Sequence, residues 1–354
     1  LQDSLGSLND RATWEQLRVR CGLEHVEAPE VDEDGLLCEA QDYVARIQHS
    51  RPFWVPRPPA LSPFEAVRRW AEPVARAALR QSMKILGHQF VMGRDIREAL
   101  ARAGANVGVL DLSSAAADKA AARIAHEYEG CQTAAASADV TQAGQVSSAI
   151  ALLLQRLGPV SVLVNCAGIM TPRMVPLSET HEAEFTQMLN VHVLGTFLCS
   201  KASLPAMQKQ GFGRIVNISS VLGLLGLPNR IGYSTAKAAI IGFTRALAVE
   251  TARSGVTVNA IAPGYILTDT LQQRVDNNMI DYARLAERAP VGRWGLPEEI
   301  ARVAAFLALP GSGFVTGATI PVDGGYSVRG DPNEDLGTAS DSLEDIRAMF
   351  ARRE

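Results

Sequence analysis

The chain has 354 residues, with 34 lysines and arginines against 38 aspartates and glutamates, and 47% of its residues are hydrophobic. This length supports a large core in one domain or two, and the weakly acidic balance argues against nucleic acids and membrane surfaces as partners. The five cysteines show no paired short spacing, which argues against a metal cluster or disulfide framework and favours a reducing, cytoplasmic setting. No apolar run reaches the ~18 residues of a membrane-spanning helix.

Residues 1–82 form an extension whose composition differs from that of the rest of the chain. They contain no lysine and three of the four tryptophans. The stretch RPFWVPRPPALSP at 51–63 is rich in proline and is predicted to be extended. The stretch at 63–79 has a helical pattern that Pro73 interrupts. No motif in this extension indicates a chemical role.

Residues 83–329 alternate between apolar strand-like runs and amphipathic helical patterns. The strand-like runs, rich in valine and isoleucine, lie at 83–87, 106–112, 160–168, 213–220, 256–264 and 319–325, and helical patterns between them include 95–104, 119–128 and 143–158. Short apolar runs separated by helices are typical of a parallel sheet that helices cover on both faces. The prediction is an α/β domain whose ligands bind beyond the carboxyl ends of its strands.

Residues 330–354 form a tail that is polar at first. Asp341, with Glu344 three residues later, resembles a helix-capping box, and apolar residues follow at helical spacing. A short amphipathic helix that docks on a neighbouring surface and a frayed tail are the two open interpretations.

Tyr233 and Lys237 have i, i+4 spacing within a long helical pattern at 232–250, so both side chains lie on one helix face. A phenol titrates near pH ~10, and a nearby ammonium favours the phenolate. Lys237 is therefore expected to lower the pKa of Tyr233 and make it a general acid or base. The same spacing also occurs in ordinary surface pairs.

Two further polar residues stand in apolar surroundings. Ser220 ends the run 213–220, so its hydroxyl is expected at the carboxyl edge of the sheet, where it can bind a substrate oxygen or simply cap a turn. Asn190 interrupts an apolar helical run and is expected to be buried. There it would tie helix backbone together or hold a water in a proton relay.

Together with other motifs, these residues resemble the short-chain dehydrogenase/reductase family over about residues 83–329. The motifs, in the family's order, are NCAG at 165–168, ISSVLG at 218–223, YSTAK at 233–237, VNAIAPGYILTD at 258–269, PVGRWGLPEEIA at 290–301 and VTGATIPVDGG at 315–325. The resemblance implies a doubly wound, Rossmann-type parallel sheet with helices on both faces. It also implies an NAD(P)-dependent oxidoreductase that is usually a homotetramer, with interfaces around 179–209 and 233–252.

The resemblance further implies roles for individual residues. Tyr233 transfers a proton to or from the substrate oxygen, Lys237 lowers its pKa and holds the nicotinamide ribose, Ser220 orients the substrate, and Asn190 anchors a relay water. The implied cofactor-binding residues are Gly87, Met92, Gly93, Asp111, Asp139, Val140, Asn165, Ala167, Gly168, Tyr233, Lys237, Pro263, Gly264, Ile266 and Thr268.

Asp111 closes an apolar run 24 residues after Gly87. A carboxylate there accepts hydrogen bonds from the adenosine ribose and repels a 2′-phosphate. Leu112 and Ser113 follow, so no adjacent arginine offsets that repulsion. NAD is therefore predicted over NADP; the alternative is an aspartate that only opens the turn into the next helix.

The glycine-rich turn departs from the family's pattern. Gly87 and Gly93 occupy its first and third positions, but Val91 occupies the second, where a side chain enters space that the cofactor uses. Lys84 is also unexpected in a central strand. Three explanations are open: a remodelled loop that still binds NAD, a scaffold that has lost cofactor binding, and a joined or shifted reading frame up to about residue 92.

Retention of the Asn190, Ser220, Tyr233 and Lys237 set favours an enzyme. The predicted reaction is hydride transfer between NAD and a small secondary alcohol or ketone, such as a sugar, a polyol or a hydroxy or keto compound. A 3-oxoacyl thioester reductase and a non-catalytic binding or assembly protein are the alternatives.

Overall fold

The computed structural model describes residues 84–87, 91–277 and 280–330. The predicted extension at 1–82 and the predicted helix of the tail lie outside the described residues. Within them a seven-stranded, wholly parallel sheet has the order β3-β2-β1-β4-β5-β6-β7. The strands are β1 (Lys84–Gly87), β2 (Asn106–Asp111), β3 (Thr133–Ser137), β4 (Val162–Asn165), β5 (Gly213–Ile218), β6 (Val256–Pro263) and β7 (Thr319–Val322).

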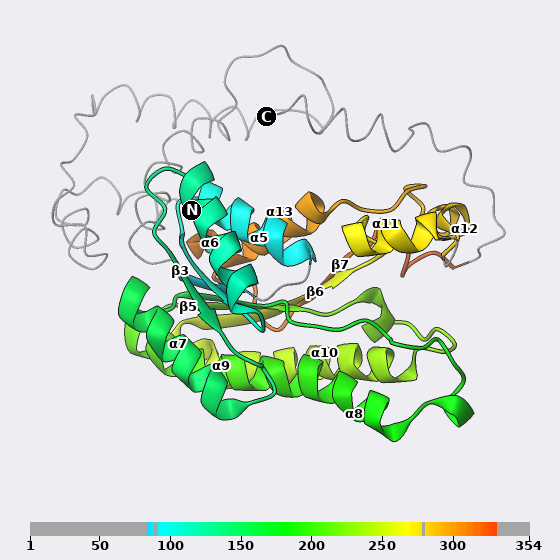
Figure 1. Ribbon diagram of the computed structural model, residues 1–354, viewed down its shortest axis with the longest axis horizontal. Helices are drawn as coiled ribbons and strands as arrows, with labels where there is room; N and C mark the ends of the chain where they lie inside the picture. Colours follow the sequence, from blue (N-terminus) through cyan, green and yellow to red (C-terminus); the bar gives the residue numbers. More distant parts are fainter. Residues whose placement is uncertain (1–83, 88–90, 278–279, 331–354) are drawn as a thin grey trace, which may run out of the picture. The chain divides into compact units, whose positions relative to one another are not determined.

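Helices cover both faces of this sheet, as the Rossmann-type prediction required (Figure 1). One face carries α5 (Val91–Arg102), α6 (Ser114–Glu127) and α13 (Pro297–Ala308), and the other carries α7 (Ala143–Leu157), α9 (Gly195–Gln210) and α10 (Ile231–Thr251). The shorter helices are α8 (Glu182–Leu189), α11 (Asp269–Asp276) and α12 (Tyr282–Arg288).

Strand β3 is the one strand of this sheet that the apolar runs did not predict. Its sequence TAAAS has neither the β-branched aliphatic nor the aromatic residues that mark strands. Its pairing with β2, with Ala135 beside Val109, identifies it instead. The sheet therefore extends one strand further than expected on the β2 side.

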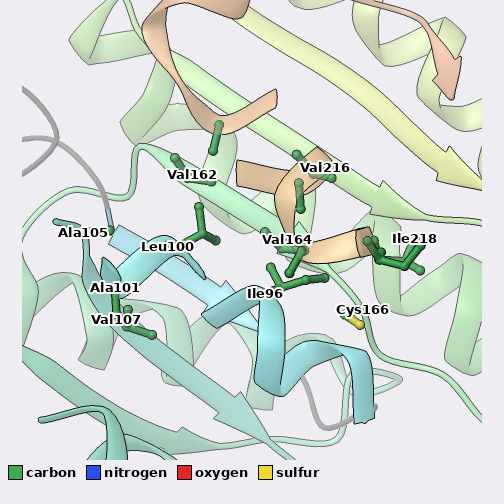
Figure 2. Close-up of a cluster of buried hydrophobic side chains, with 14 of the residues drawn as sticks. Ile96, Leu100, Ala101, Ala105, Val107, Val162, Val164, Cys166, Val216 and Ile218 are labelled. Carbon is green, nitrogen blue, oxygen red and sulfur yellow. The ribbon is translucent and has the colours of Figure 1, made fainter. Parts of the chain in front are cut away.

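The sheet is held on the α5–α13 face by a continuous apolar cluster (Figure 2). Ile96 and Leu100 of α5 pack on Val107 of β2 and on Val162 and Val164 of β4, and none of the five is more than 2% exposed. Truncating such a side chain to alanine typically costs about 2–5 kcal/mol. This packing fixes α5 against the two strands that flank β1.

The strand order reverses at β1, which lies between β2 and β4. In sheets of this kind the crevice beyond the carboxyl ends, at such a reversal, is the usual ligand site.

None of the helices in the described part of the chain combines the length and the apolar character that a bilayer crossing requires.

Candidate active site

A cavity of about 830 Å³ lies beyond the carboxyl ends of the strands. Its wall is built from α5, α6, α10, α11 and the segments that follow β4, β5 and β6. Of the residues predicted to form the site, seven lie on this wall: Gly168, Ser220, Tyr233, Pro263, Gly264, Ile266 and Thr268. The structure thus brings together residues that span a hundred positions of sequence.

Helix α10 presents Tyr233 to the cavity and places Lys237 one turn deeper. The Lys237 side chain is buried, and its Nζ donates a hydrogen bond of 2.8 Å to the Ile218 carbonyl oxygen at the end of β5. Nζ lies 5.5 Å from the centroid of the Tyr233 ring. The two side chains therefore share one helix face, as their spacing predicted.

The titration of this pair differs from the expectation. Burial raises the pKa of Tyr233 to about 12, although hydrogen bonding with Ser220 lowers it in part. Burial also lowers the pKa of Lys237 to about 8. The prediction that Lys237 lowers the pKa of Tyr233 below its ordinary value is wrong for this structure, because desolvation by burial is the largest effect on the phenol and raises its pKa. At neutral pH Tyr233 is the uncharged phenol.

The predicted cap role of Ser220 is confirmed, and its substrate-binding role stays a prediction. Ser220 caps the short 3-10 turn Val221–Gly223, where its Oγ accepts a hydrogen bond of 3.2 Å from the Leu222 N–H. The same buried side chain lies on the cavity wall and hydrogen-bonds with Tyr233. A hydroxyl fixed by a cap is a pre-oriented partner for a substrate oxygen.

The expected burial of Asn190 is wrong. Its side chain is exposed and lies outside the cavity wall. Asn190 opens a π-helical turn, Asn190–Leu194, in which the Gly195 N–H donates to the Asn190 carbonyl oxygen five residues earlier. Residues two apart on a helix face nearly opposite directions, and here His192 is the buried residue and Asn190 the exposed one.

His192 was not predicted and lies beside Tyr233. It is 1% exposed, and the two rings meet edge to face with centroids 5.5 Å apart. Nε2 lies 2.9 Å from the Ile169 carbonyl oxygen, and a proton on Nε2 would be donated to it. Nδ1 is buried and has no hydrogen-bond partner within the residues that the structure describes. Burial and the charge of Lys237 lower the pKa of His192 to about 3, so the ring is neutral.

Gly168 is the residue that makes room for His192. A Cβ atom at position 168 would lie 2.5 Å from the His192 Cε1. The only sequence signal for this pair is a second polar residue, His192, within the same apolar run as Asn190.

Several predicted cofactor residues do not line the cavity: Asp111, Asp139, Val140, Asn165, Ala167 and Lys237. Asp111 is 3% exposed and accepts a hydrogen bond of 2.9 Å from the Ser113 N–H. Asn165 donates to the Asn217 side chain at 2.8 Å. Asp139 accepts from the backbone N–H and the hydroxyl of Thr141. These hydrogen bonds order the segments that follow β2 and β3 and join the side chains of β4 and β5.

The glycine-rich turn is described only in part. Gly87 ends β1, and Gly93 is the buried third residue of α5. Val91 and Met92 begin that helix, but the predicted effect of the Val91 side chain, the predicted cofactor contact of Met92 and the charge of Lys84 lie outside the described side chains.

The wall also carries cations that the sequence did not single out. Arg94, Arg97, Lys119 and Arg123 lie on the α5–α6 side, and Arg230 and Arg274 lie on the Tyr233 side. Arg94 and Arg123 pair with Glu98. Arg97 is 5% exposed, and its Nη1 has no hydrogen-bond partner among the described residues. Burial lowers the pKa of Arg97, while Asp111 raises it. The cavity therefore suits a ligand with anionic groups.

Known proteins resemble the chain throughout this domain. The family model described as "Enoyl-(Acyl carrier protein) reductase" matches residues 87–327. A 3-oxoacyl-[acyl-carrier-protein] reductase of Synechocystis is 38% identical over 70% of this chain and 98% of its own. Galactitol 2-dehydrogenase (L-tagatose-forming) of Cereibacter sphaeroides is 40% identical over 67% and 91%. A solved structure described as a gluconate dehydrogenase of Agrobacterium tumefaciens has a TM-score of 0.65 and 32% identity over 70% and 96%.

Proposed function

The chain belongs to the short-chain dehydrogenase/reductase family, and on that premise we propose that its cavity transfers a hydride between NAD and a small secondary alcohol or ketone. The chain is thus an oxidoreductase, and the proposal concerns its cofactor, its substrate and its residues. The observation that carries the proposal is the placement of Tyr233 and Ser220 on one cavity wall, with Lys237 behind them.

The residues on the wall fit a nicotinamide dinucleotide. The cavity runs from the cations of α5 and α6, which suit phosphates, to Tyr233, beside which Pro263, Gly264, Ile266 and Thr268 would hold the nicotinamide. The buried Nη1 of Arg97, which has no hydrogen-bond partner in the described part of the chain, is a donor for an oxygen of such a ligand. When bound, the nicotinamide ring would be the group that accepts or donates the hydride.

Proton transfer falls to Tyr233. As a phenol whose pKa is raised to about 12, it is protonated at neutral pH and donates its proton to a carbonyl oxygen during reduction. The Ser220 hydroxyl donates a second hydrogen bond to the same oxygen and fixes its position. Oxidation of the alcohol requires the phenolate and is therefore expected to accelerate as pH rises.

Replacement of Tyr233 tests this assignment directly. Tyr233→Phe keeps the ring that packs on His192 and removes only the hydroxyl, so turnover is expected to fall at least ~100-fold without loss of folding, the lower range for an acid–base group. Tyr128→Phe is the matched control, since Tyr128 lies outside the cavity wall. Full activity of Tyr233→Phe would refute the role.

The preference for NAD rests on Asp111, which lies at the end of β2. The cations of α5 and α6 would favour the 2′-phosphate of NADP, but Asp111 and Arg97 attract each other and offset each other's charge. We therefore expect NAD to bind more tightly than NADP. If NADP binds more tightly than NAD, and Asp111→Asn does not change that preference, the argument from Asp111 is refuted.

Two alternatives follow from specific observations. The 3-oxoacyl-[acyl-carrier-protein] reductase relative supports a thioester substrate, which a reduction assay with an acetoacetyl thioester tests. Val91 in the glycine-rich turn supports a protein that has lost cofactor binding. A thermal shift by NAD in Val91→Gly but not in the unmodified chain would identify that second case.

A homo-oligomer is part of the proposal. Exposed apolar side chains lie on the helices named for the interfaces, with Leu194 and Phe197 around the start of α9 and Val249 near the end of α10. Such side chains are often covered by a second subunit. A monomeric mass in light scattering would exclude this assembly.

A further inference from the structure

Two arginines, Arg230 and Arg274, line the cavity close enough for their charges to interact. Arg230 immediately precedes α10, three residues before Tyr233, and Arg274 lies in the last turn of α11. Both side chains are half-buried and both line the cavity. Two separate segments of the chain therefore supply positive charge to the same end of the cavity.

Neither arginine forms an ion pair with a carboxylate in the described residues. The Arg230 guanidinium donates a hydrogen bond of 3.1 Å from Nη1 to the carbonyl oxygen of Asn229. Asp269 is the one carboxylate among the described lining residues, and it is exposed, with no hydrogen bond to either arginine. A half-buried guanidinium whose N–H donors are not all used within the protein favours hydrogen bonds to an acceptor on a bound ligand.

The charges in this part of the cavity also favour a bound anion. Burial lowers the pKa of Arg230, the nearby charge of Arg274 lowers it further, and the Tyr265 hydroxyl opposes these two effects. Like charges that share a desolvated wall repel each other, and an anion between them removes the repulsion. Guanidinium groups bind carboxylates and phosphates through paired hydrogen bonds.

We propose that Arg230 and Arg274 bind an anionic group of the substrate, so that the substrate is a hydroxy or keto compound that carries a carboxylate or a phosphate. This proposal rests on the proposed function, since it places the carbinol or carbonyl carbon of that substrate at Tyr233. It separates two classes represented among the relatives, because gluconate is a carboxylate and galactitol is uncharged.

The test compares matched charged and neutral alcohols. 3-Hydroxybutyrate is paired with 3-hydroxybutyramide, and glycerol 3-phosphate with glycerol, and kcat/KM is measured with NAD for each. The variants are Arg230→Gln and Arg274→Gln. Arg284→Gln is the control, because Arg284 is exposed on α12 and lies outside the wall. The carboxylate and phosphate pairs distinguish the two possible anions.

The unmodified protein is expected to prefer the anion of at least one pair. Each cavity variant should lower kcat/KM for that anion about tenfold to a hundredfold, the loss of one charged hydrogen bond, and change it less than about twofold for the neutral partner. A preference for neutral alcohols, or an anion preference that survives both substitutions, would overturn the proposal while leaving the oxidoreductase function intact.

If none of these alcohols is turned over, that result counts against the proposed function. A direct binding measurement then still tests the anion site. Inorganic sulfate is titrated calorimetrically into the unmodified chain and the three variants. Weaker binding in Arg230→Gln and Arg274→Gln, but not in Arg284→Gln, supports the anion site. Equal binding in all four proteins, or no binding, overturns it.

Discussion

Substitution of Gly168 by alanine tests the geometry around Tyr233. The new Cβ would lie 2.5 Å from Cε1 and 3.0 Å from Nδ1 of His192, well inside van der Waals contact. The ring cannot move aside without losing its hydrogen bond to Ile169 and its edge contact with Tyr233. Overpacking of this kind costs about 1–3 kcal/mol. We expect Gly168→Ala to lower the free energy of unfolding by that amount and to reduce turnover.

Urea unfolding of single and double variants measures the effect. His192→Ala removes the clash, so Gly168→Ala should cost about 1–2 kcal/mol less in that background than in the unmodified chain. Gly144→Ala on α7 is the control, because a Cβ there meets no atom within 4 Å, and stability should stay constant or rise by up to ~1 kcal/mol. Strictly additive costs for positions 168 and 192 would refute the contact.

Three further predictions concern charge and polarity. Between about pH 8 and the titration of tyrosine, Lys237 has lost its proton in the folded chain but keeps it in the unfolded chain. The free energy of unfolding should therefore rise with pH by up to about 1.4 kcal/mol per pH unit. Lys237→Met should abolish that rise. Asn190→Ala should change the free energy of unfolding by less than ~0.5 kcal/mol and leave turnover intact, because the side chain is exposed. A large loss of turnover would instead support the relay role of Asn190. Glu299→Ala should cost about 1–3 kcal/mol in urea unfolding, because Glu299 accepts hydrogen bonds from the Leu296 N–H and from Arg293; an unchanged midpoint would contradict this.

The sequence predicted the fold well because apolar runs and turns are local signals. The runs at 106–112 and 213–220 correspond to β2 and β5, each within two residues of its observed end. Strand β3 was missed, since alanine carries no strand signal, and only pairing with β2 reveals it. Non-local pairing is the information that a single sequence lacks.

The site was predictable where a residue's position follows from its element. Tyr233 and Lys237 share a helix face by spacing, and Ser220 lies at the sheet edge because it follows β5. Asn190 is exposed and His192, which had not been singled out, is buried within a π-helical turn that regular periodicity does not anticipate. The raised pKa of Tyr233 depends on burial that other segments of the chain provide.

Calorimetric titration of the purified full-length protein with NAD tests the central claim most directly, because every assigned role depends on a dinucleotide in the cavity. The account predicts saturable binding at one site per chain, tighter for NAD than for NADP, and retained in Tyr233→Phe. Absence of binding to both nucleotides, in the unmodified chain and in Val91→Gly alike, would contradict it.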